Sequence, residues 1–201
     1  MTRQAQPARS LRGKLTTLSS WCACLSLILL LCSDSFAFPG PEPNRPTQYD
    51  VEAAYLFNFG RFVSWPITEP PSGQFLICIL GDDPFGLTLD KTVSGENLHG
   101  KRVADKRISH PQDAVGCSIL YISSSESSRL SKILPLLKDA PVLTVSDMPD
   151  FAQQGGMIQF IVRDGRVRFV VNMGPTQTDG LALSSELLKV ALEVIPPKGS
   201  H

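Results

Sequence analysis

The sequence from Phe75 to Gly86, FLICILGDDPFG, decides the fold class of this chain. It begins with six consecutive apolar residues, Phe75–Leu80, a run too short for a helix and typical of a buried strand. Gly81 ends the strand, and Asp82-Asp83-Pro84 is typical of a helix start, because Asp caps free N–H groups and Pro loses no hydrogen bond there. A fully buried strand that leads directly into a helix indicates a parallel α/β sheet.

The rest of the chain alternates helical patterns with further apolar runs. Thr47, three residues before Asp50, predicts a capped helix that ends near Ser64, with Trp65-Pro66 beyond it. Its expected core face is Val51, Tyr55, Leu56, Phe59, Phe62 and Val63. Further helices are expected at Pro84–Val93, near Arg129–Leu137 and at Ser184–Ile195. Strands are expected at Lys101–Ile108, Ser118–Ile122, Val142–Val145, Met157–Arg163 and Arg166–Asn172.

The last two of these strands flank Asp164-Gly165, which is the two-residue signal for a tight β-hairpin. The order of elements predicts an α/β fold: a three-layer sandwich with a mostly parallel sheet, a C-terminal β-hairpin and helices on both faces. We expect one domain over residues 48–196, preceded by a Pro-rich leader at 38–47.

Residues 1–37 have the three parts of a secretory signal peptide. A basic region is followed by an apolar stretch at Leu25–Leu31 and a small-residue cleavage site at Ser35-Phe36-Ala37. An uncleaved membrane anchor is the alternative, although the apolar run Trp21–Cys32 is shorter than a bilayer span. Cleavage would remove four of 19 basic and one of 19 acidic residues and leave 15 against 18, a net charge of −3. The chain is therefore expected to be exported to the periplasm, with no affinity for nucleic acid and no membrane insertion after cleavage.

Two cysteines, Cys78 and Cys117, remain after the signal peptide is removed. An even number of cysteines in an oxidising compartment predicts a disulfide, and the two strands that carry them are neighbours in most doubly wound sheets. The pair could be a structural cross-link or two buried thiols that pack as small apolar groups. The alternative to these structural roles is a redox switch.

The carboxyl ends of the strands are where an α/β sheet binds its ligands. The candidate ligand crevice there consists of Gly81, Asp82, Asp83, Ser123 and Ser124. The alternative interpretation is that one aspartate caps a helix and the other is a turn residue. No phosphoacceptor Asp follows the third strand, and the chain has no glycine-rich nucleotide loop, no GxSxG elbow and no His pair at metal-ligand spacing. We expect a protein that is not an enzyme and has no metal and no cofactor.

Two surfaces are candidates for protein contacts. Phe57 and Arg61 lie off the expected core face of the first helix, where an aromatic side chain has no use in water. The basic side chains of the hairpin, Arg163, Arg166 and Arg168, form the second surface. Charged residues also protect exposed strands from aggregation, so we favour the helix as the docking surface.

Four separated motifs resemble the YfiR family. They are YDVEAAYLFNF at Tyr49–Phe59, the strand and turn at Phe75–Gly86, GCSILYI at Gly116–Ile122 and GGMI at Gly155–Ile158. The resemblance covers about Gln48 to Ile195 and implies a dimeric periplasmic regulator without enzymatic activity. In the family's best-understood role it would bind the periplasmic part of an inner-membrane diguanylate cyclase, hold it off, and so control cyclic di-GMP and biofilm formation.

The resemblance has one exception and one alternative. Some members carry a second cysteine pair, and this chain has no cysteine after Cys117. Members also occur beside sensor kinases. The alternative function is therefore a periplasmic ligand-binding or sensor module that works with another membrane receptor.

Overall fold

A computed structural model of the chain describes residues 45–66, 73–197 and 199. The expected signal peptide and most of the expected leader lie outside these residues. The helices are α2 (Gln48–Phe62), α3 (Leu87–Val93), α4 (Leu130–Leu136), α5 (Met173–Thr178) and α6 (Ser185–Val190), with 3₁₀ turns η1 (Pro111–Ala114) and η2 (Ser124–Arg129). The strands are β1 (Val63–Ser64), β2 (Phe75–Leu80), β3 (Asn97–Leu98), β4 (Lys101–Ile108), β5 (Ile119–Ile122), β6 (Leu143–Ser146), β7 (Ile158–Arg163), β8 (Arg166–Asn172), β9 (Ala182–Leu183) and β10 (Glu193–Ile195).

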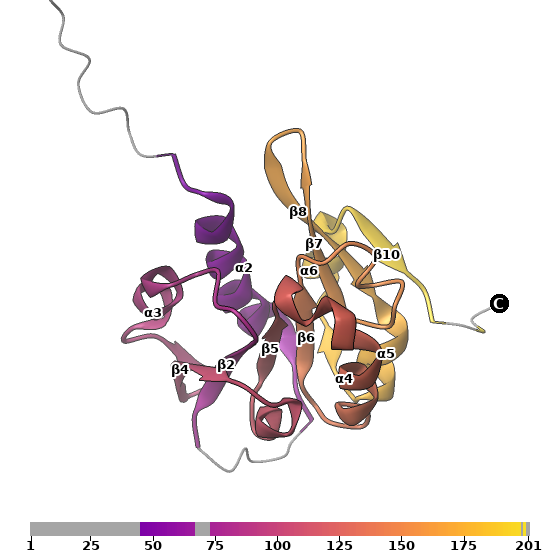
Figure 1. Cartoon of the computed structure of the whole chain (residues 1–201), viewed down its shortest axis with the longest axis horizontal. Coiled ribbons are helices and arrows are strands. Elements are labelled where there is room, and N and C mark those ends of the chain that lie inside the picture. Colours follow the sequence, from indigo (N-terminus) through magenta and orange to yellow (C-terminus); the bar gives the residue numbers. More distant parts are fainter. Residues whose placement is uncertain (1–44, 67–72, 198, 200–201) are drawn as a thin grey trace, which may run out of the picture. The chain divides into compact units, whose positions relative to one another are not determined.

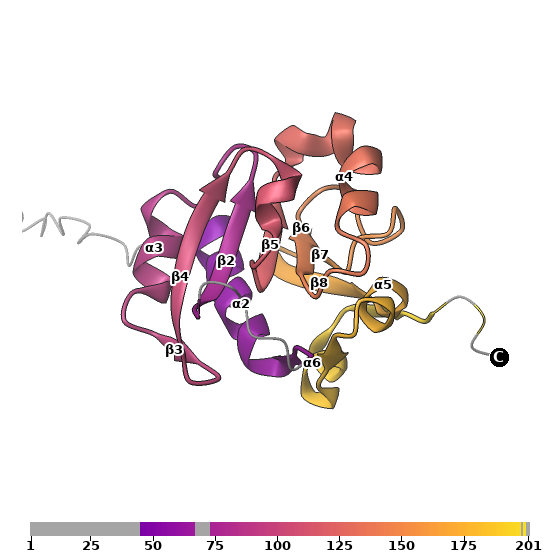
Figure 2. The same ribbon diagram turned by 90° about the horizontal axis from the view of Figure 1, so that it is seen from below.

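The main sheet has eight strands in the order β10-β8-β7-β6-β5-β2-β4-β3, and β1 pairs with β9 in a small second sheet. The strands from β4 to β7 pair in parallel, whereas β7–β8 and β3–β4 are antiparallel. The α/β class is therefore confirmed, but the sheet is mixed. Figure 2 shows it curled, with α2 on its inner side and α4 on the other.

β2 lies inside the sheet and is buried on both faces, as its sequence predicts. Ile77 and Ile79 are fully buried in the core cluster that includes α2 and α3. Cys78 and Leu80 are equally buried in a second cluster, which includes α4. Side chains that alternate along one strand thus connect the two halves of the hydrophobic core.

α2 begins at the capping box that the sequence predicts. The Asp50 N–H donates to Thr47 Oγ1 over 3.2 Å, and the Thr47 N–H donates to Asp50 Oδ2 over 2.8 Å. The helix ends at Phe62, because Val63 turns into extended backbone and pairs with β9. The buried face consists of Glu52, Ala53, Leu56, Phe59 and Gly60.

The predicted core face of α2 is confirmed at Leu56, Phe59 and Val63, which are buried, and at Tyr55, which packs on the core, but two aromatic positions differ. Phe62 is 41% exposed, although we expected it in the core. Phe57, expected outside the core, is half-buried and packs against the main cluster. Gly60 explains part of the difference, because a Cβ there would lie 2.5 Å from Leu98 Cδ1 and 3.0 Å from Phe75 Cζ. Close approach of α2 to its neighbours is thus possible along the Gly60 side of the helix.

Two further element boundaries differ from the prediction. α3 begins at Leu87 and not at Pro84, because Asp83 Oδ1 accepts a hydrogen bond from the Phe85 N–H and holds the segment in a turn. The expected C-terminal helix stops at Val190, and residues 193–195 form β10 instead. β10 pairs in parallel with β8, so the β7–β8 hairpin is not the edge of the sheet.

The β7–β8 pair turns at Asp164-Gly165, with Arg163 directly opposite Arg166. Its base is buried, whereas its tip projects beyond the core (Figure 1). Val162, which alternation places among the core residues, is 52% exposed for this reason.

Candidate functional site

The carboxyl ends of β2 and β5 meet at Gly81 and the segment Ser123–Ser125. Gly81 has a φ of +89°, and a Cβ there would lie 2.5 Å from Ser125 Oγ, so the position requires glycine. The Asp82 N–H donates to the same Ser125 Oγ over 3.0 Å. Ser123 is buried and its N–H donates to Leu80 O, while Ser124 is exposed. The structure thus brings Gly81 and Asp82 into contact with Ser125, and Ser123 into contact with the end of β2.

Asp83 turns away from this contact and pairs with Arg107 of β4. Arg107 Nε donates to Asp83 Oδ2 over 2.9 Å, and its Nη2 donates to Asp90 Oδ2 over 2.7 Å. The guanidinium also contacts Asp105. Burial opposes the positive charge, yet the hydrogen bonds to Asp90 and Asp83 raise the pKa of Arg107. Asp83 therefore has a structural role, which supports the reading as a turn residue.

The predicted disulfide between Cys78 and Cys117 is confirmed. It spans 39 residues, and its Cα atoms are 6.0 Å apart. Cys78 lies in the middle of β2, and Cys117 lies just before the adjacent strand β5. Both are buried in the second core cluster, so the cross-link connects β2 to the segment that leads into β5 beneath α4.

The two expected contact surfaces are both on the outside of the domain. On α2, the exposed residues Ala54, Arg61 and Phe62 surround the half-buried Phe57 and Asn58. We call these five residues the outer face of α2. On the hairpin, Arg163, Arg166 and Arg168 are all exposed.

A buried polar cluster, which the sequence analysis missed, lies at the ends of β5 and β6. Glu52 of α2 is fully buried and accepts a hydrogen bond from Gln48 Nε2 over 2.8 Å. Asp147 follows β6 and accepts from the Tyr49 hydroxyl over 3.3 Å. The second oxygens of both carboxyls, Glu52 Oε2 and Asp147 Oδ1, are buried and make no hydrogen bond within the described residues. Tyr121 of β5 completes the cluster.

The environment of this cluster raises the pKa values of Glu52, Tyr49 and Tyr121. Burial raises the pKa of Glu52 to about 7, a hydrogen bond from Gln48 opposes this rise, and the Asp147 carboxylate adds to it. Burial, with the charges of Asp147 and Glu52, also raises the pKa of Tyr49 and of Tyr121. The only sign of this cluster in the sequence is Glu52 itself, a glutamate within the apolar pattern of α2. Asp147, which acts on it, lies 95 residues further along the chain.

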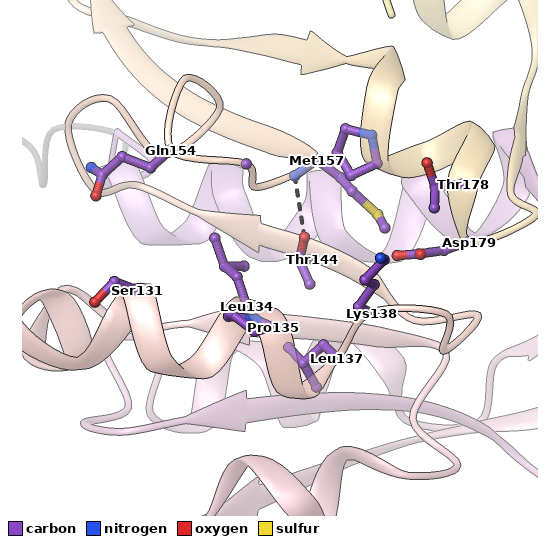
Figure 3. Close-up of a pocket in the computed structure, with 12 residues that line it drawn as sticks. Ser131, Leu134, Pro135, Leu137, Lys138, Thr144, Gln154, Met157, Thr178 and Asp179 are labelled. Atoms are coloured by element: carbon purple, nitrogen blue, oxygen red, sulfur yellow. Dashed lines mark hydrogen bonds between the residues drawn. The ribbon is translucent and has the colours of Figure 1, made fainter. Parts of the chain in front are cut away.

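A pocket of about 480 Å³ lies between α4, the start of β7 and α5 (Figure 3). Its apolar wall consists of Leu134, Pro135, Leu137, Met157 and Pro175. Figure 3 shows Lys138 and Asp179 close together at one end. Burial raises the pKa of Asp179, while a hydrogen bond from the Asp139 N–H and the charge of Lys138 lower it. The pocket thus offers an apolar wall with a cation and a carboxylate at one end.

No group of three or more His, Cys, Asp and Glu side chains among the described residues is arranged to hold a metal ion. No helix within residues 45–66 and 73–197 has the length and hydropathy required to cross a membrane.

Two solved structures resemble this chain in part. An ABC domain from Streptococcus pneumonia in complex with L-Trp shares 10% identity, with a TM-score of 0.48, over 71% of this chain and 62% of that chain. A conserved domain protein from Vibrio cholerae shares 10% identity, with a TM-score of 0.44, over 64% and 57%. The match thus spans less than two thirds of either structure, and similarities of this size carry no information about function.

The family comparison is far more extensive. The model of the YfiR/HmsC-like family matches residues 49–192, from the first turn of α2 to the segment before β10. This range contains the disulfide, the β7–β8 hairpin and the buried polar cluster. Because the match covers most of the 201 residues, the chain belongs to the YfiR/HmsC-like family.

Proposed function

We propose that this protein is a non-catalytic periplasmic regulator that binds the periplasmic part of an inner-membrane diguanylate cyclase and represses it. The observation that carries the proposal is membership of the YfiR/HmsC-like family, whose domain is associated with periplasmic control of cyclic di-GMP signalling. The buried Cys78–Cys117 disulfide supports an oxidising compartment, because such cross-links persist outside the cytosol. The sequence pattern of residues 1–37 supports export by a signal peptide.

The outer face of α2 is the proposed docking surface for the partner or for a second subunit in a homodimer. Phe62, which is 41% exposed, supplies apolar area, and Arg61 beside it supplies charge. The hairpin arginines Arg163, Arg166 and Arg168 form a second, more polar surface. Buried aromatic side chains contribute more to affinity than rim charges, which mainly affect association rates.

Deletion of the gene tests this function directly. In cells that contain the partner cyclase, loss of the repressor should raise intracellular cyclic di-GMP and surface attachment. The rise should disappear when the cyclase gene is also deleted, because the regulator then has no target. Unchanged cyclic di-GMP in the single deletion would contradict the proposal, and a rise that persists in the double deletion would exclude this partner.

A second candidate function, a ligand-binding sensor module, is favoured by the pocket beside α4. Its volume of about 480 Å³ is within the range of small-molecule sites, and Lys138 and Asp179 could orient a polar group. A thermal-shift screen separates the two functions, because a tight ligand stabilises the folded state by mass action. A hit whose shift is lost in Met157→Ala but kept in Ala54→Ser, far from the pocket, would support this candidate. A screen without such a hit would favour the repressor alone.

A further inference from the structure

The buried cluster at the carboxyl ends of β5 and β6 combines side chains from three parts of the fold. Glu52 and Tyr49 come from the first turns of α2, Tyr121 from β5, and Asp147 from the residue after β6. Phe85 packs on both tyrosine rings, with centroid distances of 5.9 Å to Tyr49 and 4.7 Å to Tyr121, and shields the cluster. Glu52 is fully buried, so its carboxyl lies away from bulk water.

Among residues 45–66 and 73–197, the charged and titratable groups that act on Glu52 include no cation. From β5 it faces Tyr121, from the end of β6 it faces Asp147, and on its own helix it has Tyr49. Gln48 is its neutral hydrogen-bond donor. Loss of hydration on burial and the negative charge of Asp147 both disfavour the ionised form of Glu52.

The hydrogen bonds of the cluster indicate how this cost is avoided. An ionised carboxyl group can only accept hydrogen bonds, and Glu52 Oε2 has no donor within the described residues. Protonation of Glu52 removes the charge from this buried, unpaired group.

We propose that the buried carboxyl of Glu52 carries a proton in the folded protein, and that this proton keeps the start of α2 packed on the carboxyl ends of β5 and β6. Loss of the proton places two negative charges between the helix and the sheet. The first turns of α2, next to the outer face, are then held less firmly. This device stands independently of the proposed function, because it follows from the buried atoms alone.

Another glutamate in the chain provides a matched contrast. Glu126 of η2 is also buried, but its Oε2 accepts a hydrogen bond from Arg129 Nε over 2.9 Å. Replacement of Glu126 by glutamine would remove this ion pair, whereas replacement of Glu52 would remove a carboxyl that has no cation beside it within the described residues. The two buried glutamates should therefore respond in opposite directions when each is replaced by glutamine, which has nearly the same shape and no charge.

The first test is a side-chain carboxyl titration of the exported protein by ¹³C NMR, with Glu52 assigned by its absence in Glu52→Gln. The pKa of Glu52 should lie near 7, and the midpoint should be the same with and without Mg²⁺. A Glu52 carboxyl that is still ionised at pH 5 overturns the proposal. A midpoint that Mg²⁺ lowers also overturns it, because a bound cation would then take the place of the proton.

Thermal unfolding of the variants is the second test. Wild-type protein should melt at a lower temperature at pH 8 than at pH 6, whereas Glu52→Gln should melt at nearly the same temperature at both. At pH 8 the Glu52→Gln variant should be the more stable of the two, and Glu126→Gln should be less stable than wild type at either pH. In wild type, the lower melting temperature at pH 8 should be accompanied by faster amide exchange of residues 50–54, after correction for the intrinsic rate. The Glu52→Gln variant should not show this faster exchange. Equal destabilisation by both glutamine variants at pH 8 contradicts the proposal.

Discussion

Removal of the Cys78–Cys117 cross-link should destabilise the protein by about as much as the loss of a large core side chain. The bond closes a loop with a sequence separation of 39 residues. In the chain-entropy description, closing such a loop lowers the conformational entropy of the unfolded chain. This raises the free energy of unfolding by about 4 kcal/mol at 25 °C. With a urea dependence of about 2 kcal/mol per molar, the unfolding midpoint should fall by about 2 M.

Three samples separate the cross-link from the packing of the sulfur atoms. Oxidised wild type, wild type reduced under denaturing conditions and refolded with reductant, and the Cys78→Ala/Cys117→Ala double variant should be unfolded in parallel. Reduced wild type loses only the covalent bond, whereas the double variant also loses two buried sulfur atoms from the second core cluster. The double variant should therefore be the least stable of the three.

A single Cys78→Ser change adds a further cost. Cys78 is fully buried in β2, so the serine hydroxyl would enter an apolar cluster and lose its hydration, at about 1–3 kcal/mol beyond the cross-link. Urea unfolding followed by circular dichroism measures each difference. Reduced wild type within about 1 kcal/mol of the oxidised protein would refute the chain-entropy reasoning.

Three other predictions concern packing, the docking surface and pH. Gly156→Ala should destabilise the fold by about 2 kcal/mol or more in urea, because its Cβ would lie 2.1–2.4 Å from ring atoms of the buried Phe151. Phe62→Ala should weaken partner binding or self-association, measured by light scattering, with little change in melting temperature, whereas Phe57→Ala should lower that temperature because Phe57 packs on the core. The pKa of Glu52 rises from 4.5 to about 7 on folding, so its stabilising contribution is complete below pH 4.5 and lost as the pH rises through 7. Unfolding at pH 5 and pH 8 should differ by about 3 kcal/mol through this group, and no difference between wild type and Glu52→Gln would contradict it.

The parts of the fold that the sequence predicts well are encoded by neighbouring residues. The six apolar residues of β2, the Thr47 capping box and the Asp164-Gly165 turn each act over a few positions, and each forms as expected. The disulfide is also predictable, because the part of the chain that the structure describes contains two cysteines, which pair with each other.

The missed features depend on residues far apart in the chain. β10 was expected as the end of a helix, because Leu187, Leu188, Ala191 and Leu192 repeat at helical spacing. The Leu192 N–H instead donates to Phe169 O over 2.8 Å, so a free edge of β8 determines the outcome. The residues around 193–195 do not indicate that β8 has an unpaired edge. A strand of three residues is also too short to show a clear alternation of apolar and polar side chains.

The burial of Glu52 on α2 has a similar cause. The expected core face did not include Glu52, because Tyr121 and Asp147, which surround it with polar groups, follow 69 and 95 positions later. Asp83 was assigned to a candidate crevice because it follows the end of a strand. Its partner Arg107 lies 24 residues later on β4, so no local pattern contains the pair. In both cases the environment of a carboxyl group was decided by tertiary contacts and not by its neighbours in sequence.

The most direct test of the central claim is a measurement of cyclic di-GMP by mass spectrometry in a deletion strain complemented in two ways. One strain receives the full chain, and the other receives residues 38–201 with a new initiator methionine, which should remain in the cytosol. A periplasmic repressor predicts that only the full chain restores the low cyclic di-GMP level, although both proteins are expressed in equal amounts. Equal restoration by the two forms, or no restoration by the full chain, would contradict the account.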